Sequence, residues 1–328
     1  MAKLVTVMGW NIENFGKSKF ETKKGGRELI ALIAEVMMHN NVDVAAFCEI
    51  RSRLGDDIGK EIKNTLSKTA KKNWSYIFSS QFGAKRMEQY LFVWNEDVVG
   101  RLKSQEEFDD PAKPGKLLGF PKQSKIDRPP FLCYFNIKSK NKEVLIAMMH
   151  SPAPTPTSGP RDAANCLANV KEFKTEGTTC IIMGDFNVSV SVNASSPGTP
   201  GAYAFGPLVT TANFEQLLPD DSQSSLISRN AAFVGMIIDD CRSQPYDQLF
   251  FRNNPILTHS NEGVEELISE CITPPLPLNK GYIAAKLSDI NKKRLGNPQT
   301  TYTKVEDAFI DFRYFVSDHF PVIVQIYG

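Results

Sequence analysis

The apolar residues of this chain follow two patterns, one typical of buried β-strands and the other of amphipathic α-helices. Short apolar runs predict strands at residues 4–10, 42–49, 90–94, 131–137, 144–149, 179–183, 246–251 and 320–326. Apolar residues at helical spacing predict helices at residues 27–39, 58–70 and 161–173. Many strands with few helices indicate the α/β class, and we expect two mixed β-sheets packed face to face and flanked by helices, a four-layer sandwich.

Two stretches break this pattern. Residues 188–206 are rich in Ser, Gly, Pro and Ala and predict a long surface loop. Residues 253–300 hold a Pro-rich run at 274–277 and many polar residues, so we interpret them as an irregular surface insertion. The strands predicted before and after residues 253–300 fit a single set of packed sheets. We therefore expect one domain over residues 1–328, and the two insertions are candidate sites for a protein partner.

The composition is that of a globular protein with almost no net charge. Of 328 residues, 41% are hydrophobic, and 38 basic residues face 37 acidic ones, which leaves a formal charge of +1. This balance excludes a polybasic, tail-like nucleic-acid binder and a strongly acidic solvating chain. It does not exclude an enzyme that acts on nucleic acid, because local charge can differ from the sum.

The chain as given carries no signal for a membrane or for export. No apolar run approaches the ~18 residues of a membrane span, and no signal peptide is apparent. The six cysteines are scattered without a C-x-x-C motif, which argues against a zinc site and favours a reducing compartment. We expect a cytoplasmic protein, with a removed leader or a delivered toxin as alternatives.

Polar residues recur at the edges of the predicted strands, where active sites tend to be built. They are Asn11, Glu49, Glu88, His150, Asp185, Asn187, Asp247, Asp318 and His319. One such residue alone is most often a turn residue or an ordinary core or surface side chain. That reading weakens because two of only four histidines fall at strand edges, whereas His39 and His259 are expected at the surface.

This set of residue types fits the hydrolysis of a phosphate ester assisted by a metal ion. Carboxylate and amide oxygens suit Mg²⁺ or Mn²⁺ better than zinc. A neutral histidine can accept a proton, and a carboxylate behind it fixes its tautomer. Motifs of NTPases, dinucleotide-binding proteins and serine hydrolases are missing from the sequence.

Eight segments of the chain resemble, in order, those of the endonuclease/exonuclease/phosphatase superfamily and, within it, of the deoxyribonuclease I branch. They are WNIENFG (10–16), FCEIR (47–51), MEQYLFVW (87–94), RPPF (128–131), HSPAP (150–154), GDFN (184–187), YDQLFF (246–251) and SDHFPV (317–322). They span nearly the whole chain, and GDFN followed by a C-terminal SDHFPV is specific. A Glu paired with the histidine of an HSxP-type segment is typical of the deoxyribonuclease I branch.

The resemblance implies a role for each strand-edge residue. Glu49 would bind the divalent metal, helped by Asn11 and Asp318. Glu88 would orient His150, and Asp247 would orient His319. Asp185 and Asn187 would position the attacking water and the scissile phosphate. The sequence leaves open which histidine is the general base, and the implied cofactor is Mg²⁺, with Mn²⁺ as an alternative and Ca²⁺ undecided.

Basic residues are concentrated where a polyanion would bind. Residues 51–86 hold nine basic and three acidic side chains, a local charge of +6. Arg51 and Arg86 each lie two residues from a predicted catalytic carboxylate. The resemblance implies that Arg51 reaches the DNA minor groove, and Arg86 stands where deoxyribonuclease I has an aromatic residue. We expect Arg51, Arg86 and Arg128 to bind substrate.

We therefore expect a divalent-metal-dependent endonuclease that hydrolyses DNA phosphodiester bonds with low sequence specificity. One alternative is a phosphatase or a phospholipid or sphingomyelin phosphodiesterase of the same superfamily, with residues 272–278 as the candidate membrane-facing loop. Another is a binding module that keeps the fold but not the activity. The choice between DNA and RNA and between single and double strands stays open.

Overall fold

The computed structural model describes residues 2–51, 53–83, 87–101, 116–117, 128–151, 159–175, 178–188, 204–218, 246–253, 268–272, 281–295, 312 and 315–328. Arg86, and most of the predicted surface loop at 188–206, lie outside the described residues.

Two mixed β-sheets form the centre of the fold. The first has the order β12 (Ile268–Ile272), β13 (Val322–Tyr327), β1 (Lys3–Phe15), β2 (Val44–Arg51), β4 (Glu88–Asn95), β3 (Trp74–Phe78). The second has the order β10 (Glu215–Gln216), β11 (Asp247–Arg252), β9 (Thr179–Asp185), β8 (Lys142–His150), β7 (Phe131–Ile137), β5 (Val99–Arg101), with β6 (Lys116–Leu117) also paired to β7. The pairs β1–β2 and β8–β9 are parallel and the others are antiparallel.

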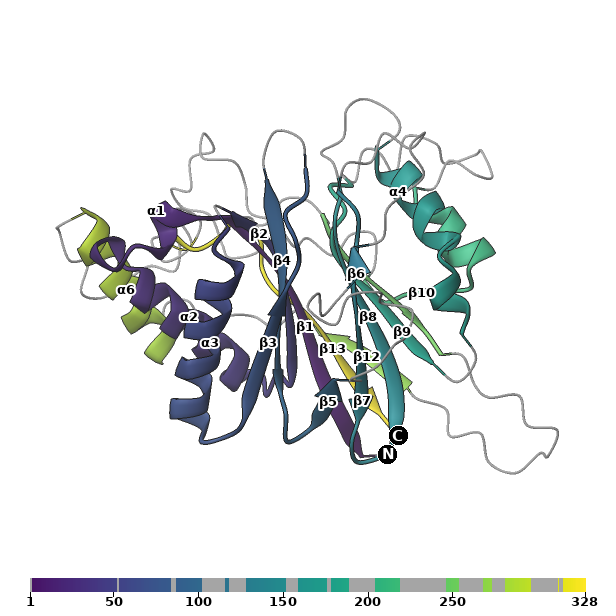
Figure 1. Ribbon diagram of the computed structural model, residues 1–328, viewed down its shortest axis with the longest axis horizontal. Helices are drawn as coiled ribbons and strands as arrows, with labels where there is room; N and C mark the ends of the chain where they lie inside the picture. Colours follow the sequence, from purple (N-terminus) through teal and green to yellow (C-terminus); the bar gives the residue numbers. More distant parts are fainter. Residues whose placement is uncertain are drawn as a thin grey trace, which may run out of the picture.

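Helices cover both outer faces of the two sheets, so the expected four-layer α/β fold is confirmed (Figure 1). Helices α2 (Gly26–His39), α3 (Gly55–Ala70) and α6 (Gly281–Leu295) lie outside the first sheet, and α4 (Gly159–Ala168) lies outside the second. The shorter helical segments are α1 (Lys17–Phe20), η1 (Thr22–Lys24), η2 (Lys171–Lys174) and η3 (Pro207–Thr211). No helix in the described part of the chain is long and apolar enough to span a membrane.

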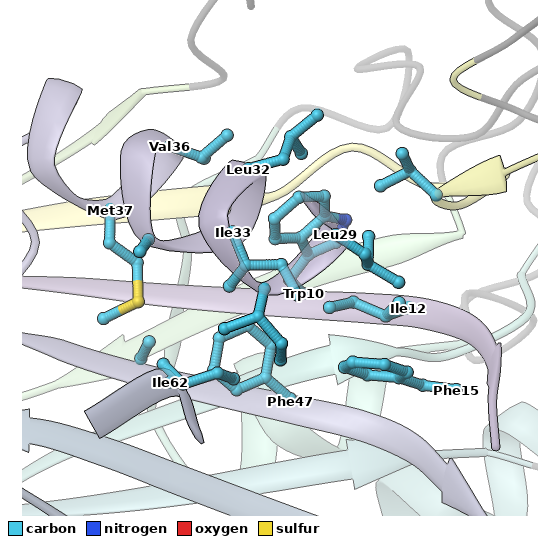
Figure 2. Packing of buried hydrophobic residues seen from close by; sticks show 14 of the residues in the cluster. Trp10, Ile12, Phe15, Leu29, Leu32, Ile33, Val36, Met37, Phe47 and Ile62 are labelled. Atoms are coloured by element: carbon cyan, nitrogen blue, oxygen red, sulfur yellow. The ribbon is translucent and has the colours of Figure 1, made fainter. Parts of the chain in front are cut away.

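Three apolar cores separate the four layers. The first core lies between the first sheet and its helices, and Figure 2 shows Trp10, Ile12 and Phe15 of β1 beside the apolar side chains of α2. The second fills the space between the two sheets, and the third lies between the second sheet and α4. Because side chains alternate along a strand, every central strand supplies one row of residues to each of two cores.

The interpretation of residues 253–300 as irregular is wrong for two stretches. Strand β12 pairs with β13 at the edge of the first sheet. Helix α6 buries Leu287 and Ile290 in the core shared with α2, and its Lys293 forms an ion pair with Glu28 of α2. The many lysines and polar residues of α6 conceal this narrow apolar face in the sequence. The assignment of residues 1–328 to one domain stays a prediction.

Gly184 of β9 lies where no other residue fits. Its φ is +139°, and a Cβ there would lie 1.9 Å from the carbonyl oxygen of Met149 on the neighbouring strand. We predict that Gly184→Ala lowers the free energy of unfolding by about 2–4 kcal/mol, because it adds both backbone strain and a steric clash. Gly206→Ala is the control, since a Cβ there meets nothing within 4 Å. Urea denaturation that finds the two variants equally stable would contradict this account.

The thiols of the described cysteines differ in burial. Burial raises the pKa of Cys133 and of Cys180 to about 12, so the reactive thiolate is scarce at pH 8. Cys166 is only partly buried. We predict that iodoacetamide at pH 8 modifies Cys166 well before Cys133 or Cys180 in the folded protein, as read by peptide mass mapping. Equal labelling of the three in native protein would argue against this packing.

Candidate active site

The predicted site residues continue the rows of side chains that fill the core between the sheets. Four of them lie two positions from a member of that core: Glu88 before Tyr90, His150 after Met148, Asp185 after Met183 and Asp247 before Leu249. A spacing of two keeps a side chain on the same face of its strand. Pairing brings His150 level with Asp185, and Asp185 level with Asp247. These residues therefore meet at one end of the space between the sheets.

A glycine brings the two sheets together at this end. Gly9 of β1 faces Met183 of β9 so closely that a Cβ would lie 2.9 Å from the Met183 sulfur. Two residues further along each strand, the Asn11 Nδ2 donates to the Asp185 Oδ2 at 2.9 Å in a buried hydrogen bond. The close approach at Gly9 thus places a polar contact across the sheets at the strand ends.

Glu49 reaches the site through an irregularity in its strand. Alternation along β2 would place Glu49 on the helix side with Phe47, but Glu49 has a φ of +61°, and the pairing of β2 with β4 shifts between Phe47 and Ile50. Such a bulge re-aims a side chain. The Glu49 Oε2 accepts hydrogen bonds from the Asn14 N–H at 2.9 Å and from Arg51 at 3.0 Å.

His150 is held at both ring nitrogens. Its Nδ1 lies 2.8 Å from the Glu88 Oε2, and Arg128 donates to its Nε2 at 3.0 Å. Arginine can only donate, so Nε2 carries the lone pair and Nδ1–H donates to Glu88. A second nitrogen of Arg128 lies 3.1 Å from the other oxygen of Glu88. Burial alone would lower the pKa of His150, but the hydrogen bond to Glu88 and the nearby carboxylates outweigh it and raise this pKa.

His319 is held in the same way by Asp247. Its Nδ1 lies 2.7 Å from the Asp247 Oδ2, and its main chain is fixed by a hydrogen bond from its N–H to the Ser317 hydroxyl and by one from the Trp10 indole N–H to its carbonyl. Burial alone would lower the pKa of His319, but the carboxylates of Asp247 and Asp185 raise it well above its usual value.

Asp185 lies between the two histidines. Its Oδ2 is 3.7 Å from the Nε2 of His150 and 3.6 Å from the Nε2 of His319. Its Oδ1 accepts the N–H of Asn187, whose side chain in turn donates to the Ser151 carbonyl. Burial raises the pKa of Asp185 to about 6, against the opposing effect of the two imidazoles. Two histidines, each backed by a carboxylate, thus face a single buried acid.

The donor set on the first sheet's side of the site fits a hard divalent cation. The Asn11 Oδ1 is buried without a hydrogen-bond partner in the described part of the chain, and Glu49 carries the carboxylate beside it. Burial tends to raise the pKa of Glu49, but His150, the Asn14 N–H and Arg51 lower it to about 2, so this carboxylate is ionised. Within the described residues, no three His, Cys, Asp or Glu side chains are arranged to hold a metal. Mg²⁺ usually takes one or two protein carboxylates and keeps several waters, so a small ligand set suits it.

The structure brings together ten of the twelve predicted site residues through the contacts above, and Asp318 lies beside them, its Oδ1 3.6 Å from the Nε2 of His319. Arg86 lies outside the described residues. Sequence reasoning missed Trp10, Ser317 and Tyr90, which hold the main chains of the two histidines. Their positions inside the matched segments WNIENFG, SDHFPV and MEQYLFVW were the available signal.

Curated relatives include a deoxyribonuclease. The deoxyribonuclease-1 of sheep (Ovis aries) is 23% identical to this chain over 233 residues, which cover 71% of this chain and 82% of the sheep protein. The match covers most of both proteins, but an identity of 23% does not establish a shared substrate.

Solved structures share the fold at low sequence identity. A mannosyl-6-phosphatase from Bacteroides thetaiotaomicron superposes with a TM-score of 0.56 at 14% identity, over 99% of this chain and 100% of that one. The catalytic domain of human nocturnin gives a TM-score of 0.54 at 13% identity, over 99% and 93%. The model of the endonuclease/exonuclease/phosphatase family matches residues 8–319. Because that match covers almost the whole chain, this protein belongs to the endonuclease/exonuclease/phosphatase family.

Proposed function

We propose that this protein is a divalent-metal-dependent endonuclease that hydrolyses DNA phosphodiester bonds with low sequence specificity. The family hydrolyses phosphoester bonds, and its members include nucleases and phosphatases. The observation that carries the proposal is the pair of histidine–carboxylate contacts, Glu88–His150 and Asp247–His319, on either side of Asp185. Hydrolysis of a diester needs a proton removed from water and a proton delivered to the leaving oxygen, and two such histidines supply both functions.

The proton transfers follow from the ring contacts. Each Nδ1 is engaged by a carboxylate, so each Nε2 is the nitrogen that can exchange a proton with water or substrate. A phosphate would draw Arg128 away from the Nε2 of His150 and free that nitrogen. One imidazole then takes a proton from the attacking water as the new P–O bond forms, and the other protonates the oxygen that leaves as the ester bond breaks.

Members of the family generally use a divalent metal. Glu49 and Asn11 would hold it in this chain, with Asp318 nearby, and Mg²⁺ or Mn²⁺ suits their oxygen atoms. The ion would neutralise charge that develops on the phosphate. The hydrogen bonds from Asn14 and Arg51 keep the Glu49 carboxylate oriented, and together with the nearby His150 they keep it ionised.

DNA is favoured as the substrate by sequence and by charge. The similarity to sheep deoxyribonuclease-1 extends over 233 residues, and the Glu88–His150 contact involves the two residues typical of that branch. Arg51 and Arg128 are both partly exposed beside the site, where they can contact the phosphate backbone. A phosphatase or a phospholipid phosphodiesterase is the competing activity and belongs in the same experiment.

We predict that the protein nicks supercoiled plasmid with Mg²⁺ and that EDTA abolishes the reaction. His150→Ala should lower the nicking rate by about 10²–10⁴-fold, the usual loss when a general acid or base is removed. His39→Ala is the matched control, because His39 is exposed at the end of α2 and should leave the rate unchanged. Agarose gels of a time course measure the nicking rates of the wild type, His150→Ala and His39→Ala.

A panel of substrates distinguishes the proposed nuclease activity from the alternative activities. Single-stranded DNA, RNA, a phosphomonoester and phosphoinositide or sphingomyelin vesicles are tested with Mg²⁺, Mn²⁺ or Ca²⁺. Intact plasmid at high enzyme and metal concentration, together with turnover of a monoester or a phospholipid, would reject the proposal and assign the other activity.

We predict that Asp247→Asn lowers the pKa of His319, because it removes a carboxylate that raises this pKa. In metal-free wild-type protein His319 should stay protonated above pH 7. In the variant His319 should lose its proton at a lower pH than in the wild type. A ¹H–¹⁵N titration of the imidazole signals measures both proteins. The variant should also cleave DNA about 10- to 100-fold more slowly. An unchanged His319 titration in Asp247→Asn would refute the assigned pairing.

A further inference from the structure

The main-chain N–H of His150 is bound by a side chain from the opposite sheet. His150 ends β8 of the second sheet, and its N–H donates to the hydroxyl oxygen of Tyr90, on β4 of the first sheet, at 2.9 Å. The bond is buried. Tyr90 therefore contacts the main chain of His150, whereas Glu88 contacts its imidazole.

The sheet itself leaves this N–H without a strand partner. Strand β7 begins at Phe131, which pairs with Met148, so the β7–β8 ladder stops two residues before His150. The residues just before β7 are Pro129 and Pro130. On the other side of β8, the next N–H, that of Ser151, already donates to the Asp185 carbonyl. A buried N–H needs a partner, and the Tyr90 hydroxyl is the one that this fold supplies.

Aromatic packing fixes where this hydroxyl lies. The Tyr90 ring is fully buried and stacks on Phe82, with ring centroids 4.4 Å apart, and on Phe131, at 6.3 Å. Burial also raises the pKa of Tyr90 well above its usual value, so the group stays a neutral hydroxyl. Its contact atom is therefore held in one place and in one protonation state.

Tyr90 and Glu88 act on the same histidine from the same strand. They are two residues apart on β4, so both side chains point into the space between the sheets. Glu88 contacts the ring of His150, and Tyr90 contacts its main chain. We propose that Tyr90 is a positioning residue that fixes the backbone of His150, so that the ring held by Glu88 is aligned for proton transfer. This inference rests on the proposed hydrolytic function of the site.

Tyr90→Phe tests the proposal by removing one oxygen atom. We expect kcat for the best substrate of the panel to fall about 10- to 100-fold, the usual effect of losing a group that orients a functional histidine, while KM stays within about twofold. Phe92→Leu is the matched control, because Phe92 is equally buried two residues further along the same face of β4 and has no polar atom. It should lower stability and leave kcat near the wild-type value.

Amide hydrogen exchange supplies a readout that does not depend on activity. In Tyr90→Phe the His150 N–H should exchange faster than in the wild type, whereas that of Met148 should not change, and Phe92→Leu should affect neither selectively. A Tyr90→Phe enzyme with wild-type kcat, or a Phe92→Leu enzyme with the same loss, would overturn the proposal. If the wild type hydrolyses no phosphoester, the proposed function fails on its own, and unchanged His150 exchange would then still refute the contact.

Discussion

The arrangement of the site depends on the contacts made by the buried carboxylate of Asp185. It accepts a hydrogen bond from Asn11 across the two sheets and one from the Asn187 N–H, and it lies within 3.7 Å of both His150 and His319. An ionised acid with so little exposure is costly unless donors surround it. The two sheets, the two asparagines and the two histidines are therefore held around one carboxylate, and the position of each depends on the others.

The fold builds this site by extending the core between the sheets. Strands alternate their side chains, so the rows that end in Met148, Met183 and Leu249 lead at the same spacing to polar residues at one edge. The first sheet contributes Asn11, Glu49 and Glu88, and the second contributes His150, Asp185 and Asp247. A site divided in this way forms only when the two sheets are packed, which links the geometry of the site to the stability of the packing between them.

Some features of the fold and of the site can be predicted from the sequence, and others cannot. The four-layer fold, the central strands and the polar residues at their edges follow from apolar runs and alternation, since those patterns report burial directly. The bulge at Glu49 could not be foreseen, because alternation assigns that side chain to the helix face. Tyr90 reads as one more apolar residue in a buried strand, and only the three-dimensional structure reveals the donor at its hydroxyl. Helix α6 is not apparent from the sequence, because polar residues such as Ser288 and Lys293 surround its buried Leu287 and Ile290.

The most direct test of the account is a double-mutant cycle on the two histidines. Single-turnover cleavage of plasmid is measured for the wild type, His150→Ala, His319→Ala and the double variant. If both imidazoles serve the same phosphoryl-transfer step around Asp185, each single change lowers the rate by about 10²–10⁴-fold, and the double variant is little slower than the worse single variant. Losses that multiply in the double variant, or a His319→Ala enzyme with wild-type cleavage, would contradict the account.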